Sequence, residues 1–238
     1  MTYTLTQVEQ DRLKNAIVAA LSIPFIDDIE DYIWEAIFSY TKDIPLVDPL
    51  TSIRSKKLFD IVDNDNKIGW SAKAIQWHIA PEVEFELVIQ RADIFKKAAD
   101  LGFDDLDKNS PAELLGKALL KHWIDEKIIK DAAIQNVTDK RVCILLKSRD
   151  RKYFAYFEDD ISECSPNDLS WKWTDDTKTG LQGIRKSDGF CVFRWYPNQK
   201  QFFERFVLPQ NSFIFRLEPK RIPLEDIVQV LTEHLNNH

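Results

Sequence analysis

The sequence predicts an α/β protein in which a mixed β-sheet is flanked by helices. Three observations support this fold class. Two segments with helical spacing of apolar residues come first, and two short extended runs joined by a turn signal follow them. A long amphipathic segment then precedes an unbroken apolar run of the kind found in buried strands. The order helix, hairpin, helix, strand is typical of such a fold.

The first two helices are expected over residues 6–21 and 27–40. In the first, apolar residues recur at helical spacing from Val8 to Leu21, and Pro24 ends the segment. The second carries acidic residues in its first turn, where the helix dipole favours them.

A β-hairpin is expected next. Residues 58–63 and 68–75 are extended runs on either side of Asn64-Asp65-Asn66-Lys67, which is a strong turn signal. A further strand is expected over 85–91. These short runs supply the first part of the sheet.

The rest of the chain alternates between the same two element types. An amphipathic helix is expected over 111–134, with Ser110 and Glu113 forming a capping box. Residues 141–147 read as a buried strand and 153–157 as its hairpin partner, and the chain then stays aromatic and β-rich to about 217. A last helix is expected over 224–235.

Composition narrows the function classes. With 238 residues, 44% hydrophobic and 30% charged, the chain fits a single globular domain, 1–238. It has no apolar run near 18 residues, and its first residues lack the pattern of a signal peptide, so no membrane association is expected. Three widely spaced cysteines without a CxxC pair argue against disulfides or zinc and favour a cytoplasmic location.

Charge is unevenly distributed along the chain. A net charge of −7 argues against a protein that coats nucleic acid indiscriminately. However, 140–152 and 171–205 are rich in basic residues, whereas acid is concentrated in 27–35 and 100–107. Such a chain could hold metal ions with one part and phosphates with another.

The hairpin is the first candidate site. A loop of two or four residues pairs Asp63 with Ile68 and so Asp60 with Ser71, which places Asp60, Ser71 and Lys73 on one face. The carboxylate could hold a divalent cation, and the ammonium could orient an attacking water. A loop of odd length would swap the faces and make Asp63 the candidate. The simpler alternative is a surface ion pair worth a fraction of a kcal/mol.

Helix 27–40 supplies a second carboxylate. Glu30 falls inside its apolar arc, whereas Asp31 and Glu35 fall outside it. A carboxylate on a buried face needs a counter-charge, a metal or a shifted pKa, which makes Glu30 a candidate site residue. Alternatively, Glu30 only complements the helix dipole.

These residues resemble a known family. Phe59-Asp60 followed by Gly69-Trp70-Ser71-Ala72-Lys73 is similar to the PD-(D/E)xK nuclease motif of type II restriction endonucleases. The resemblance covers about residues 25–160 as a catalytic core and leaves 161–238 as a DNA-recognition part. It implies a restriction-endonuclease-like fold and Mg²⁺-dependent hydrolysis of double-stranded DNA, with Mn²⁺ as a possible substitute.

Carried over by position, Asp60 would bind the metal, Lys73 would be the catalytic lysine and Glu30 the supporting helix carboxylate. Ser71 departs from the motif, because it stands where an acid is expected and its hydroxyl is a weaker Mg²⁺ ligand. Glu30 or Asp63 would then complete the metal charge, or the site would be weak or inactive.

The aromatic C-terminal part offers candidate DNA contacts. Basic and amide side chains there could neutralise phosphates or contact base edges. The candidates are Lys172, Trp173, Gln182, Arg185, Arg194, Asn198, Lys200 and Gln201. The alternative is a sheet whose rings point into a core and whose polar residues point into solvent.

The sequence thus favours a site-specific DNA endonuclease, as a homodimer if its site is palindromic. One rival is a catalytically inactive DNA-binding protein with a degenerate nuclease fold, which Ser71 favours. The other is a protein–protein interaction module, which the overall acidity and aromatic content allow. The glycine-rich motifs of nucleotide-binding enzymes and the GxSxG of serine hydrolases are absent.

Overall fold

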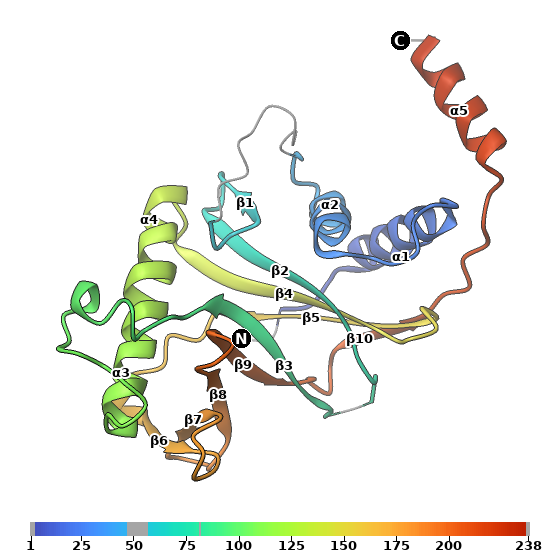
Figure 1. The fold of residues 1–238 in the computed structure, drawn as a ribbon. Helices are drawn as coiled ribbons and strands as arrows, with labels where there is room; N and C mark the ends of the chain where they lie inside the picture. The colour runs from blue at the N-terminus through green and yellow to red at the C-terminus, as the bar shows by residue number, and fades with distance from the viewer. Residues whose placement is uncertain (1–2, 47–56, 81, 237–238) are drawn as a thin grey trace. The chain divides into compact units, whose positions relative to one another are not determined.

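The computed structural model of the chain describes residues 3–46, 57–80 and 82–236. The chain divides into two compact units, each with its own sheet (Figure 1). Unit 1 comprises 1–81, 137–160 and 209–238, and unit 2 comprises 82–136 and 161–208. One change of unit falls at 160/161, where the sequence places the end of the catalytic core, and the chain also crosses between the units after 81, 136 and 208.

Unit 1 is built on a mixed five-stranded sheet, which confirms the α/β class. Strand β2 is parallel to β4, and the other neighbours are antiparallel. In spatial order the strands are β1 (Ile61–Asp63), β2 (Ile68–Gln76), β4 (Asp139–Lys147), β5 (Tyr153–Asp160) and β10 (Phe213–Arg216). The expected hairpins 58–63/68–75 and 141–147/153–157 are therefore present.

Helices α1 (Gln7–Ser22) and α2 (Asp31–Lys42) lie on the same side of this sheet (Figure 1). Their buried residues pack with those of β2, β4 and β5 into one core, in which Trp34 and Phe38 of α2 contact the ring of Tyr156. On β2, Trp70 and Ala72 point into this core. Because side chains alternate along a strand, Ser71 and Lys73 point to the opposite face.

Helix α2 begins at Asp31 rather than at residue 27. The carboxylate of Asp28 accepts a hydrogen bond from the backbone N–H of Ile29, whose side chain is fully buried. Glu30 is the N-cap residue, but its side chain makes no capping hydrogen bond. The later start decides which carboxylate lies at the first helical position.

The expected C-terminal helix is present as α5 (Leu224–Asn236), and none of its side chains is buried. Among the described residues, no helix is both long and apolar enough to span a bilayer.

Unit 2 is built on an antiparallel five-stranded sheet. In spatial order its strands are β3 (Glu84–Arg91), β9 (Gln201–Val207), β8 (Cys191–Tyr196), β7 (Leu181–Arg185) and β6 (Leu169–Trp173). Helix α3 (Ala112–Trp123) continues through a π-helical turn, 124–129, into α4 (Lys130–Gln135). Gly116 of α3 and Gly183 of β7 leave room for the ring of Trp171.

The expected capping box at the start of α3 is absent, so that prediction was wrong. Pro111 occupies the N-cap position, and the Ser110 hydroxyl instead bonds to Asp107 in the preceding turn. The carboxylate of Glu113 accepts a hydrogen bond from the backbone N–H of Trp171 at 2.9 Å. A long-range contact to β6 thus replaces the local one that the sequence pattern indicated.

Candidate functional site

The hairpin has the expected register. Asp63 pairs with Ile68 and Ile61 pairs with Trp70, so the loop is even in length, and Asp60 lies one residue before the paired segment. The backbone N–H of Asp60 donates to the Trp70 carbonyl at 2.9 Å, just before β1 begins. The alternative of an odd loop, with Asp63 on the face of Lys73, is therefore excluded.

The side chains of Asp60 and Lys73 meet on this face. Lys73 Nζ lies 3.7 Å from Asp60 Oδ2, and the two side chains are 27% and 25% exposed. Asp60 Oδ2 also accepts a hydrogen bond from the backbone N–H of Ala72 at 2.8 Å. Lys73 Nζ donates to the Ala72 carbonyl at 3.1 Å, so both side chains are held close to the backbone of β2.

Asp31 of α2 contacts the same strand, two residues beyond Ala72. Its Oδ1 accepts a hydrogen bond from the backbone N–H of Ala74 at 3.0 Å. The pairing of β1 with β2 ends at Trp70, which leaves the next edge N–H groups of β2 to other acceptors. Asp60 and Asp31 are these acceptors, and successive N–H groups on one edge are roughly 7 Å apart.

Burial and the neighbouring carboxylate affect Asp60. Removal from water raises the pKa of Asp60 above its ordinary value, and the negative charge of Asp31 raises it further. The positive charge of Lys73 and the N–H of Ala72 oppose this rise. A bound cation would stabilise such a carboxylate, because it would compensate for the hydration that burial removes and for the repulsion from Asp31.

Glu30 does not occupy the position that the sequence suggested. Its side chain is exposed at the start of α2, and the carboxylate that reaches β2 is that of Asp31. The sequence pattern favours Glu30 over Asp31 because Asp31 lies outside the apolar arc of the helix. Asp31 does lie outside that arc. It reaches the edge of β2 because it is the first residue of α2, and a side chain at the end of a helix can contact a strand without lying on the buried face of the helix.

Ser71 and Asp63 have different surroundings. Ser71 lies on the face of Asp60 and is 6% exposed. The Asp63 carboxylate accepts hydrogen bonds from the backbone N–H groups of Asp65 and Asn66 and from the Asn66 amide. These bonds hold the pKa of Asp63 below its usual range and give its carboxylate a structural role in the turn.

Asp31 and Asp60 are thus the carboxylates that could share a cation. No group of three or more His, Cys, Asp or Glu side chains with metal-binding geometry occurs among the described residues. Mg²⁺ often binds through one or two carboxylates and keeps several waters, so two carboxylates fit it better than zinc. The Ala72 carbonyl is a further hard oxygen beside them.

In unit 2, the sheet brings several predicted DNA contacts together. Lys172 pairs with Gln182, and Gln182 pairs with Arg194, so the three side chains form a row across β6, β7 and β8. Neighbouring strands are about 4.8 Å apart, which sets the spacing of the row. Gln201 pairs with Tyr196, two residues from Arg194, and lies on the same face.

The other predicted contacts are elsewhere. Trp173 pairs with Leu181, and its alternation places it on the opposite face from Lys172. The remaining three lie in turns or at a strand end, each with a polar partner: Arg185 with Asp188, Asn198 with Lys108, and Lys200 with Asp93. The sheet therefore groups four of the eight candidates on one surface, where the Arg194 guanidinium is paired with Glu86 at 3.2 Å.

Comparison with known proteins identifies no relative. No family model, no curated protein and no solved structure matches the chain.

Proposed function

We propose that the protein is a metal-dependent endonuclease that cleaves double-stranded DNA at specific sites. One observation carries the proposal: Asp31 and Asp60 are anchored to alternate N–H groups of the strand that bears Lys73. Two carboxylates held against one strand, with an ammonium carried by that strand, are the groups that hydrolysis of a phosphodiester needs.

Each residue has a defined task in this reaction. Asp31 and Asp60 would hold Mg²⁺, or Mn²⁺ in its place, and the ion would lower the pKa of a bound water and neutralise phosphate charge. Lys73 donates hydrogen bonds toward the attacked phosphate and stabilises the charge that develops on it. The N–H groups of Ala72 and Ala74 fix the two carboxylates, so that little reorganisation is required.

The architecture of unit 1 supports a restriction-endonuclease-like fold. An acidic helix terminus precedes the motif hairpin, and the buried strand β4 follows and lies parallel to β2. The row Lys172, Gln182 and Arg194 in unit 2 is the surface we assign to DNA, with a cation for phosphates and an amide and guanidinium for base edges. A palindromic site would be matched by a homodimer. Free cysteines are consistent with the cytoplasm.

A second candidate function is DNA binding without cleavage. The buried Ser71 favours it, because a hydroxyl at this position adds no charge to the metal site. The two candidates share the DNA surface and differ only in the reaction.

The test is digestion of mixed-sequence DNA by the purified protein with Mg²⁺, and separately with Mn²⁺, beside Lys73→Ala. Discrete fragments with 5′-phosphates from the wild type and none from the variant are expected. Intact DNA from both proteins in both metals would overturn the nuclease, and salt-dependent binding of the same DNA would then select the second candidate.

A further inference from the structure

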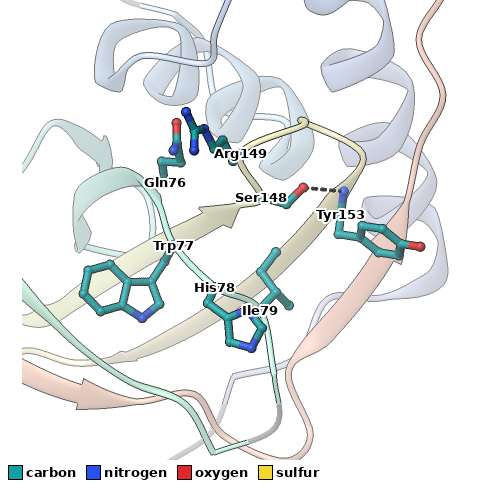
Figure 2. Close-up of a pocket in the computed structure, with 7 residues that line it drawn as sticks. All are labelled: Gln76, Trp77, His78, Ile79, Ser148, Arg149 and Tyr153. Carbon is teal, nitrogen blue, oxygen red and sulfur yellow. Dashed lines mark hydrogen bonds between the residues drawn. The ribbon is translucent and has the colours of Figure 1, made fainter.

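A cavity of about 630 Å³ lies at the end of the strand that bears Lys73, within unit 1. Its walls come from the last residue of β2 with the segment after it and from the turn between β4 and β5 (Figure 2). The lining residues are Gln76, Trp77, His78, Ile79, Ser148, Arg149 and Tyr153. The volume is within the usual range for small-molecule sites.

The cavity opens on the same face of β2 as the candidate site. The backbone N–H of Trp77 donates to the Lys147 carbonyl at 3.0 Å, which continues the parallel ladder one residue beyond β2. Alternation along the strand therefore gives Trp77 the same face as Lys73. Four residues of extended chain separate them by about 13 Å, which corresponds to about four base-pair steps of DNA.

The lining side chains suit a nucleobase. Trp77 is 38% exposed and Tyr153 46% exposed, although both line the cavity. The Arg216 guanidinium lies over the Tyr153 ring, 5.7 Å from its centroid, which makes Trp77 the ring we assign to base stacking. In the view of Figure 2, His78 is drawn between Trp77 and Tyr153, and the Tyr153 ring points away from Trp77. Gln76 and Arg149 are the polar side chains with the longest reach among the lining residues. Aromatic rings that stack bases, combined with a cation, are the usual means of binding single-stranded nucleic acid.

The charge of Arg149 strengthens this assignment. Arg149 is exposed and forms no ion pair within the part of the chain that the structure describes. Its neighbours Arg151 and Lys147, by contrast, are both paired with Asp28. An unpaired guanidinium beside aromatic rings can bind a phosphate, and its hydrogen-bonding groups can also contact a base edge.

We propose that this cavity binds an unstacked nucleotide of the strand being cut, about four steps from the scissile phosphate. The proposal rests on the proposed nuclease function and names its substrate more closely. Extruding a base from a duplex costs a few kcal/mol, and the cost is lowest where the base is mismatched or already unpaired. The enzyme should therefore bind DNA with an unpaired segment more tightly than a fully paired duplex.

The test measures binding without cleavage. A fluorescent mixed-sequence 12-nucleotide single strand and the duplex of the same sequence are titrated by fluorescence anisotropy, with EDTA present to prevent hydrolysis. The wild type should bind the single strand more tightly. Trp77→Ala should weaken single-strand binding about tenfold, because one base–aromatic stack is lost. Arg149→Ala should weaken it and lower the salt dependence by about one phosphate contact.

Two positions of the same unit away from the cavity serve as controls, one exposed and one partly exposed. Tyr40→Ala removes an exposed ring from α2, and Arg12→Ala removes a cation from α1, and both should bind as the wild type does. Trp77→Phe keeps a ring and should fall between wild type and Trp77→Ala. If Trp77→Ala fails to fold by circular dichroism, Trp77→Phe and Arg149→Ala decide the result.

The outcomes separate the two proposals. Wild-type affinity in Trp77→Ala and Arg149→Ala, or duplex bound more tightly than single strand, would overturn the nucleotide cavity whether or not DNA is cleaved. Trp77-dependent binding without any cleavage in Mg²⁺ or Mn²⁺ would leave the cavity in place and overturn only the nuclease.

Discussion

The carboxylate of Asp31 accepts a hydrogen bond from the backbone N–H of Ala74, 43 positions later in the chain. This bond ties the first residue of α2 to the edge of β2, next to the N–H that Asp60 accepts. It keeps the two carboxylates near one another despite their repulsion. A divalent cation bound by both carboxylates would attract each of them and so outweigh their mutual repulsion.

Replacing Asp31 should therefore strongly reduce metal-dependent activity, whereas replacing its neighbour Glu30 should not. Asp31→Asn keeps an acceptor for the Ala74 N–H but removes the charge, and we expect Mn²⁺ affinity and DNA cleavage to fall by about 100-fold. Glu30→Gln is the matched control and should change either quantity less than about twofold. Equal losses in both variants would show that helix charge, and not the Asp31 position, is what matters.

Asp60 should make the metal-free fold less stable at neutral pH. Because the pKa of Asp60 is raised in the folded state, folded protein binds this proton more tightly than unfolded protein does. The contribution to stability is present at low pH and is lost as pH rises through the raised pKa.

Asp60→Asn should accordingly increase the free energy of unfolding at pH 7 by on the order of 1 kcal/mol, as often follows removal of a functional charge. Urea denaturation in EDTA from pH 7 toward pH 4 measures it, and the difference from wild type should shrink as pH falls. A variant no more stable than wild type at pH 7 would contradict the raised pKa.

Ser71 is the position at which added charge should strengthen the metal site. Ser71→Asp places a third carboxylate on the face of Asp60, and we expect Mn²⁺ to bind about tenfold more tightly. Without metal, the same variant should be less stable, because Ser71 is 6% exposed and an uncompensated charge there is costly. Ser71→Ala is the control. If Ser71→Asp binds Mn²⁺ no better than Ser71→Ala, the cation does not lie near residue 71.

Gly116 should resist substitution although it lies within a helix. Alanine favours a helix over glycine by about 1 kcal/mol, which alone would stabilise α3. A Cβ at this position would, however, lie 2.3 Å from ring atoms of Trp171, and relieving such overpacking typically costs about 1–3 kcal/mol. We expect Gly116→Ala to lower the free energy of unfolding of unit 2, measured by chemical denaturation. The exposed neighbour Lys117→Ala should change it by less than about 0.5 kcal/mol.

Local features were accessible to sequence reasoning. The Asn64–Lys67 turn and the two-residue alternation of the strands set the hairpin register, and the register alone places Asp60 beside Lys73. The unbroken apolar run of β4 likewise predicts a strand buried on both faces, and its residues 142–147 are all buried. These predictions hold because each depends on contacts between residues that are near in sequence or on burial alone.

Features that depend on long-range packing were decided by the tertiary structure. The choice of Asp31 over Glu30 depends on where α2 begins and on an N–H that β1 leaves uncovered, and neither is visible in the helix pattern. The division into two units and the row of Lys172, Gln182 and Arg194 likewise depend on strand order. Side-chain periodicity shows which face a residue occupies, but only the packed fold shows which distant backbone group lies opposite it.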